Sequence, residues 1–167
     1  MQEVVSSILP ENINKDIIQL LKQTEGWYFG FDEKIPNSFL NEDEGLALRT
    51  FGDNCILNKN TQTLNMFAHI VASIVCSKLK VKFKGLKRVN YNFYHPLSRG
   101  KLHIDSEHPN CVSILYNLNT NDGTTEIDNS QFVSKASEAI VSDSNKVHRG
   151  TGPTKGLRYN LNIIIYT

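Results

Sequence analysis

The spacing of apolar residues changes once along this chain, near residue 80, and this change constrains the fold more than any other feature. Before it, residues 12–25 and about 61–79 carry apolar side chains three and four positions apart, the spacing of a helix with a buried face. After it, apolar and polar residues alternate in short segments, which is typical of β-strands. Helices followed by strands predict a mainly β fold with flanking α-helices, arranged as a sandwich or a jelly roll.

The boundaries of these elements follow from local signals. Asn12 or Asn14 is expected to cap the first helix, and Gly26 to stop it. Residues 27–58, which include Pro36, predict short strands and irregular connections. The later predicted strands lie in KVKFKG, RVNYNFYHP, KLHID, NCVSILYNLN, TTEID, EAIVSD and LRYNLNIIIYT.

Length and cysteine content favour one domain in a reducing compartment. The 167 residues suit a single core, with helical support in about 1–80 and a β core in about 81–167. The three cysteines are odd in number and far apart, which argues against a disulfide framework and a zinc–thiolate site. With no signal peptide apparent at the N-terminus, the expected location is cytoplasmic.

The charge pattern gives no indication of a nucleic-acid or membrane partner. The net charge is +1, and no segment approaches the ~20 apolar residues of a membrane-spanning helix. Lys80, Lys82 and Lys84 alternate with apolar residues, so we expect solvated lysines on an edge strand. The alternative, a basic rim for an acidic peptide or a nucleic acid, would show as binding that weakens steeply with salt. The sequence gives no oligomeric state.

A possible metal site begins in KLHIDSEHP. His103 and Asp105 flank Ile104, and residues two apart in an extended strand project from the same face. His148 is a candidate third ligand, placed after the predicted strand EAIVSD. Two imidazoles and one carboxylate suit non-haem Fe(II) with open coordination positions. The alternative is a hydrogen-bonded surface pair of His103 and Asp105, with no metal.

A cation follows ten residues after His148. By strand parity, Arg158, Asn160 and Asn162 share one face of the last predicted strand, and Tyr159 and its apolar partners share the other. A guanidinium inside a β-structure is costly to bury without an anion, and its planar fork matches a carboxylate. Together with the candidate metal ligands, this predicts a site for a 2-oxo-dicarboxylic acid. The alternative reading makes Arg158 a solvated strand end.

The series HID, His148 and Arg158 resembles the Fe(II)/2-oxoglutarate-dependent dioxygenases, and more narrowly the prolyl 4-hydroxylase-like group. The resemblance covers roughly residues 86–167 by motif. It implies a double-stranded β-helix (jelly roll) in which His103, Asp105 and His148 bind Fe(II). It also implies 2-oxoglutarate and O2 as cosubstrates, with ascorbate in a supporting role.

The resemblance further assigns residues to the cosubstrate. Arg158 would hold the C5 carboxylate of 2-oxoglutarate, helped by Tyr94, which lies nine residues before His103. Tyr91 is the substitute for Tyr94. Asn160 completes an Arg-x-Asn pair that resembles the group's Arg/Lys-x-Ser and would be a second polar partner.

The resemblance implies hydroxylation of a C–H bond, with a prolyl side chain in a peptide or protein as the leading substrate. The chain departs from the group at Gly100, Asn117, Thr124 and Ile127, where tyrosines, a second glycine and an aromatic residue are common. The same core could instead oxidise a small molecule, such as a free amino acid, or an alkylated nucleobase. A non-catalytic metal-binding, sugar-binding or cupin-like module is the remaining alternative, although the His-x-His of cupins is missing.

Overall fold

Two antiparallel sheets and two helices make up the part of the chain that the computed structural model describes, residues 1–29, 45–53, 55 and 57–167. The helices are α1 (Glu11–Lys22) and α2 (Lys59–Leu79). In spatial order, the large sheet contains β1 (Gln2–Val5), β8 (Ala139–Asp143), β5 (Cys111–Asn117), β10 (Arg158–Tyr166), β4 (Gly85–Tyr94), β3 (Leu46–Phe51) and β2 (Tyr28–Phe29). The small sheet contains β7 (Ser130–Val133), β6 (Thr124–Ile127) and β9 (His148–Gly150).

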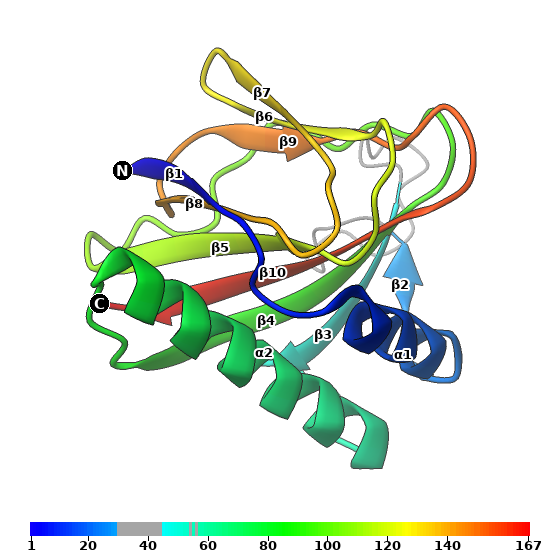
Figure 1. The fold of residues 1–167 in the computed structure, drawn as a ribbon, viewed down its shortest axis with the longest axis horizontal. Coiled ribbons are helices and arrows are strands. Elements are labelled where there is room, and N and C mark those ends of the chain that lie inside the picture. The colour runs from blue at the N-terminus through cyan, green and yellow to red at the C-terminus, as the bar shows by residue number, and fades with distance from the viewer. Residues whose placement is uncertain (30–44, 54, 56) are drawn as a thin grey trace.

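The helices cover one face of the large sheet, and the small sheet lies over the other face (Figure 1). Neighbouring strands are antiparallel throughout, and β10 lies between β4 and β5 at the centre of the large sheet. The predicted mainly β architecture with flanking helices is confirmed. The N-terminal eighty residues supply three strands of the large sheet in addition to the helices.

The central strand β10 is buried on both faces, as its strand parity predicts. Leu161, Ile163 and Ile165 join the hydrophobic core that packs against α2. Arg158, Asn160 and Asn162 point the other way and are buried as well. A strand covered on both faces can carry apolar residues on one side and a polar site on the other, because its side chains alternate. The large sheet therefore separates the core from the polar interior.

The helix caps differ in part from the expected ones. Pro10 is the N-cap residue of α1 without a side-chain cap bond, so the expectation of Asn12 or Asn14 as the cap is wrong. The Asn14 amide is instead buried, donating to Ser137 Oγ and accepting from the hydroxyl of Tyr116. α2 begins slightly earlier than expected, because the preceding residue, Asn58, and Thr61 form a capping box.

Several strand predictions need correction. Lys80 adopts the left-handed conformation that ends α2, and residues 81–84 form no strand, so KVKFKG is not an edge strand. KLHID contributes a single β-bridge at His103 rather than a strand. His148 opens β9 instead of following a strand into a turn. β1 and β7 were not predicted, and the predicted connection around Pro36 lies outside the described residues.

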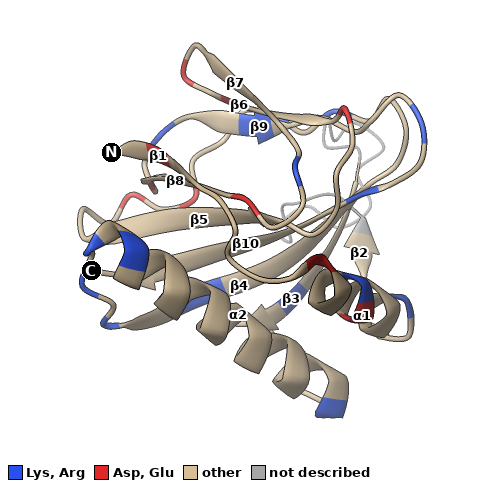
Figure 2. Cartoon of the chain, in the orientation of Figure 1, with Lys and Arg blue, Asp and Glu red and all other residues tan. Residues whose placement is uncertain are grey.

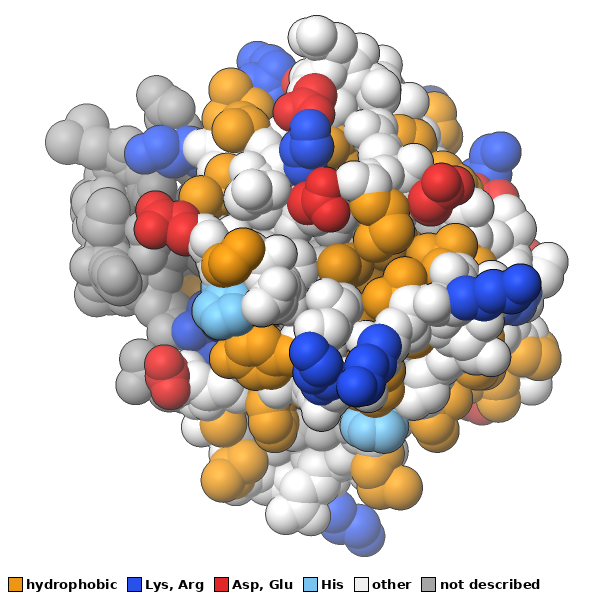
Figure 3. Space-filling model, turned by 90° about the vertical axis from the view of Figure 1, so that its left-hand side faces the viewer, with side chains coloured by type: hydrophobic (Ala, Val, Ile, Leu, Met, Phe, Trp, Pro, Cys, Tyr) orange, Lys and Arg blue, Asp and Glu red, His pale blue; other side chains and the backbone are white. Residues whose placement is uncertain are grey.

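Charged side chains are dispersed over the molecule. Basic residues lie on both helices, on β9 and in several loops (Figure 2). On the face shown in Figure 3, basic, acidic and hydrophobic side chains are interspersed. None of the described helices is long and apolar enough to cross a membrane.

Candidate active site

Backbone pairing brings the two candidate histidine ligands together. His103 and His148 form an isolated antiparallel bridge in which each amide donates to the other's carbonyl, at 3.0 and 2.9 Å. Their ring centroids lie 4.4 Å apart. The Asp105 amide donates to the carbonyl of Ser144, in the turn before β9, at 2.9 Å. Candidate ligand atoms of His103, Asp105 and His148 consequently lie within 4.8 Å of one another.

Hydrogen bonds fix the tautomer of both imidazoles. His103 Nδ1 lies 2.8 Å from the carbonyl of Lys101, and His148 Nδ1 lies 2.9 Å from the carbonyl of Lys146. A carbonyl can only accept, so each Nδ1 carries a proton, and in the neutral imidazole each Nε2 keeps the lone pair. Backbone acceptors of this kind commonly orient metal-binding histidines. Both rings are thus prepared to bind a metal through Nε2.

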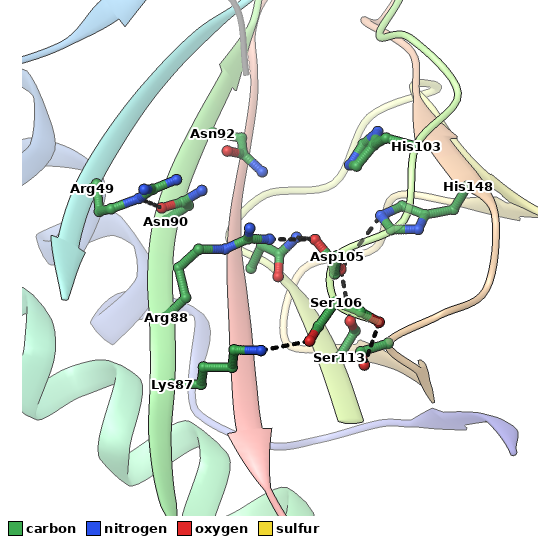
Figure 4. A network of polar contacts seen from close by, with 12 residues as sticks. Arg49, Lys87, Arg88, Asn90, Asn92, His103, Asp105, Ser106, Ser113 and His148 are labelled. Carbon is green, nitrogen blue, oxygen red and sulfur yellow. Dashed lines mark hydrogen bonds and ion pairs between the residues drawn. The ribbon is translucent and has the colours of Figure 1, made fainter. Parts of the chain in front are cut away.

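The Asp105 carboxylate is buried, with 1% of its side chain exposed, and is surrounded by donors. Arg88 and the Asn162 amide donate to Oδ1 at 2.5 and 3.0 Å, and the Ser113 hydroxyl donates to Oδ2 at 2.6 Å. Oδ2 also lies 3.4 Å from His148 Nε2. Figure 4 shows Asp105 between Arg88 on one side and the two histidines on the other. The donors hold the carboxylate in one orientation toward the imidazoles.

These surroundings determine the charge on Asp105. Burial by itself would raise its pKa, but His148 when protonated, the Arg88 guanidinium, His103 when protonated and the Ser113 hydroxyl lower the pKa below its ordinary value. The group is therefore an anion at neutral pH. A metal site needs this, since a carboxylate must be deprotonated to bind the ion.

Arg158 is completely buried at the other end of the same face of β10. Its guanidinium donates to the carbonyls of Thr124 and Thr151 at 2.5 and 3.0 Å and to the Thr125 hydroxyl at 2.6 Å. None of the described Asp or Glu residues forms an ion pair with it, and its Nε has no hydrogen-bond partner within the described chain. Burial lowers the pKa of this guanidinium, and Tyr94 opposes the shift. A buried cation with only neutral acceptors is suited to receive an anionic ligand.

Tyr94 lies beside this guanidinium, and Tyr91 does not. Tyr94 pairs with Arg158 across β4 and β10, and its ring centroid is 5.2 Å from the guanidinium carbon. The Tyr91 hydroxyl instead donates to the carbonyl of Leu64 in α2, on the opposite face of the sheet. Of the two tyrosines, only Tyr94 faces the polar interior.

Two glycines permit close packing around this pair. A Cβ at Gly150 would overlap the Tyr94 hydroxyl, and a Cβ at Gly123 would lie 2.9 Å from the Arg158 side chain. Real Cβ atoms essentially never approach another atom so closely. The absence of a side chain at these two positions lets the small sheet approach Arg158 and Tyr94.

Asparagines line the face of the large sheet between Arg158 and the triad of His103, Asp105 and His148. Asn160 pairs in register with Asn92 on one side and Asn117 on the other, and Asn92 donates to Asn160 Oδ1 at 3.0 Å. Asn160 Nδ2, Asn117 Oδ1 and Asn162 Oδ1 are buried and lack hydrogen-bond partners within the described chain. Buried polar groups are normally paired, so these atoms are available to hydrogen-bond a polar ligand.

The predicted site residues thus fall into two groups on one face. His103, Asp105 and His148 form the first, and Arg158, Tyr94 and Asn160 surround the second. Sequence reasoning missed the residues that hold Asp105, which are Arg88, Ser113 and Asn162. Strand parity offered a signal for Arg88, because it alternates with Asn90, Asn92 and Tyr94 along β4.

The known proteins that this chain resembles are found by structure. No family model and no curated protein matches the sequence. A prolyl hydroxylase in complex with a hypoxia inducible factor peptide fragment, from Trichoplax adhaerens, superposes with a TM-score of 0.72 at 16% identity, covering 99% of this chain and 83% of the other. A Pseudomonas putida prolyl-4-hydroxylase gives a TM-score of 0.67 at 13% identity, covering 99% and 92%. A non-heme alpha-ketoglutarate-dependent carbocyclase from nogalamycin biosynthesis gives 0.71 at 11% identity, covering 99% and 79%.

These likenesses extend over nearly the whole chain and concern its architecture. They confirm the predicted jelly roll, or double-stranded β-helix, and agree with the family resemblance of the motifs. The described residues place a His-Asp-His cluster inside that fold. The chain therefore has the fold of the Fe(II)/2-oxoglutarate-dependent oxygenases, prolyl hydroxylases among them.

Proposed function

We propose that this protein is an Fe(II)- and 2-oxoglutarate-dependent dioxygenase that hydroxylates a C–H bond, with a prolyl side chain of a peptide or protein as the substrate. One observation carries the proposal. A His-Asp-His cluster and a buried arginine without a described acidic partner lie on the same face of the sheet around β10. In this proposal residues 1–167 form one catalytic domain.

The donor set of the triad fits Fe(II). His103 and His148 offer neutral imidazole nitrogens, and Asp105 offers one negative charge. Two histidines and a carboxylate are the ligands of non-haem Fe(II) oxygenases, and a thiolate-rich site would favour other metals. A bound Fe(II) would supply O2 activation coupled to conversion of 2-oxoglutarate to succinate and CO2. The protein's contribution is to hold the ligands, exclude water and orient the reactants.

The polar interior fits a dicarboxylate. Arg158 and Asn162, which contacts Asp105, are four residues apart on β10, on the order of 13 Å along an extended strand. An extended five-carbon dicarboxylate, together with its bond to a metal at one end and its hydrogen bonds to a guanidinium at the other, reaches across a distance of this order. Arg158 would bind the far carboxylate with Tyr94 beside it, and the unpaired Nδ2 of Asn160 would donate to the same ligand.

A peptide substrate is supported by likeness alone. One similar structure is a prolyl hydroxylase in complex with a peptide fragment, and another is a bacterial prolyl-4-hydroxylase. A small-molecule substrate is the second candidate, because a carbocyclase and an epimerase from nogalamycin biosynthesis have the same fold at 11% and 10% identity.

The test is turnover with candidate substrates. Purified protein with Fe(II), ascorbate and 2-oxoglutarate is incubated with proline peptides, and succinate and hydroxylated product are quantified together. We expect succinate that depends on Fe(II) and disappears in the Asp105→Asn variant. Turnover of small molecules but of no peptide would overturn the prolyl assignment, and no 2-oxoglutarate conversion under any condition would overturn the enzyme assignment.

A further inference from the structure

We propose that the substrate carries a carboxylate next to the oxidised carbon, and that Arg88 and Lys87 of β4 bind it beside the metal ligands. This inference rests on the proposed function, since it names the substrate class of that same site. The carboxylate can belong to an Asp or Glu side chain in a peptide or to a free carboxylic acid.

A register shift in β4 brings two consecutive cations to the site. Ile164 of β10 pairs with Arg88, whereas Ile165 pairs with Leu86, so Lys87 is an extra residue in the ladder. Consecutive residues of a regular strand project from opposite faces, but here the side chains of Arg88 and Lys87 both reach the segment that carries His103 and Asp105. Arg88 contacts Asp105 Oδ1 and Lys87 contacts Ser106 Oγ, each at 2.5 Å. Figure 4 shows both extending from β4 toward this segment.

Neither cation has an acidic partner of its own within the described chain once a metal is bound. Arg88 pairs with Asp105 Oδ1, but a bound metal would share the single negative charge of the same carboxylate. The Arg88 Nε is buried and lacks a hydrogen-bond partner among the described residues. Among the described residues, the Lys87 ammonium contacts the neutral hydroxyl of Ser106 and lies 5.9 Å from the centroid of the Tyr166 ring. Cations held this way favour an anionic partner.

The other charges of the site are already matched. The two carboxylates of 2-oxoglutarate are assigned to the metal and to Arg158, so they do not neutralise Arg88 or Lys87. The residues that alternate with Arg88 along β4, Asn90 and Asn92, are neutral amides. A basic substrate would be repelled here, whereas a carboxylate would gain charge-assisted hydrogen bonds.

The two cations are also within reach of an incoming molecule. The Arg88 side chain is 26% exposed, while the Asp105 carboxylate that it contacts is 1% exposed. The Arg88 side chain therefore extends from the buried carboxylate to solvent. A substrate that approaches the metal from this side meets the guanidinium before it meets the triad.

The experiment uses the intact Fe(II)-loaded protein and peptide pools in which one residue next to a central proline is acidic, neutral or basic. A second arm offers free carboxylic acids, including proline, against their amides. Product is measured by mass spectrometry and succinate is measured in parallel. We expect the acidic pool, or the free acids, to be oxidised preferentially. Arg88→Gln and Lys87→Gln should each raise KM for that substrate about tenfold.

Three variants separate charge recognition from damage to the triad. Arg88→Lys should keep the preference for acids, because it keeps the positive charge. Lys87→Gln changes no described contact of Asp105, so an unchanged Fe(II) affinity in a chelator competition would assign its effect to charge recognition. Lys84→Gln removes an equal charge from the exposed lysine that contacts Thr167, and should leave KM unchanged.

The failures of the two proposals are distinguishable. Normal Fe(II)-dependent succinate formation with equal use of acidic, neutral and basic substrates, or an acid preference that survives both Gln variants, would overturn the carboxylate proposal alone. A protein that converts no 2-oxoglutarate, with or without substrate, would overturn the proposed function.

Discussion

Replacing Arg158 with Gln should weaken 2-oxoglutarate binding by roughly 150-fold. The guanidinium is fully buried, and its described partners are two carbonyls and one hydroxyl, so its positive charge is available to the ligand. Leaving a carboxylate buried without its cation costs about 3 kcal/mol, which corresponds to about two orders of magnitude in Kd. A shorter neutral amide also leaves some of the acceptors unsatisfied, so the free energy of unfolding should fall by about 2 kcal/mol.

Anaerobic calorimetric titration of 2-oxoglutarate into the Fe(II)-loaded protein measures the Kd, and urea unfolding measures the stability change separately. Arg149→Gln is the matched control, because Arg149 pairs with Glu126 on the small sheet and has no described contact with the site. The Kd of the Arg149→Gln variant for 2-oxoglutarate should match that of the wild type. If Arg158→Gln is folded and binds 2-oxoglutarate as tightly as the control, Arg158 is not the cosubstrate arginine.

Three further predictions concern the surroundings of Asp105 and of Tyr94. Ser113→Ala removes the hydroxyl donor to Asp105 and should weaken Fe(II) binding about tenfold in a chelator competition. An unchanged Kd for Fe(II) would show that this hydrogen bond does not support the metal ligand. Gly150→Ala places a methyl against the Tyr94 hydroxyl, so both Tm and 2-oxoglutarate affinity should drop, and an unaltered Tm would refute the close packing. The folded-state pKa of Asp105 lies below its ordinary value, so its contribution to metal-free stability is present above about pH 4 and is lost as pH falls through the folded pKa. Urea unfolding from pH 7 to pH 3 should show this loss in the wild type and a flatter profile in Asp105→Asn.

The site residues whose direction depends on strand parity could be predicted from the sequence. Arg158 and Asn160 could be placed on the polar face of β10, because alternation fixes direction once a strand is identified. The long apolar stripe of α2 was equally readable, since its buried residues recur at helical spacing. These features are local, and the fold retains them.

Features that depend on pairing between distant segments could not be predicted from the sequence pattern. β1 pairs with β8 at a sheet edge through backbone hydrogen bonds, and its short segment shows little alternation. His103 is held by a single bridge to His148 rather than by a strand of its own. The contact of Lys87 with Ser106 depends on a register shift, which no residue type in KRVN reveals.

We propose that His103, Asp105, His148 and Arg158 form one site for a metal and a dicarboxylate. Calorimetry of 2-oxoglutarate binding with and without Fe(II), under anaerobic conditions, tests it most directly. If one ligand bridges metal and guanidinium, Fe(II) should tighten 2-oxoglutarate binding at least tenfold in the wild type, and this gain should vanish in Asp105→Ala. Equal affinity with and without Fe(II), or a gain that persists in Asp105→Ala, would show that the metal and the guanidinium do not bind one ligand together.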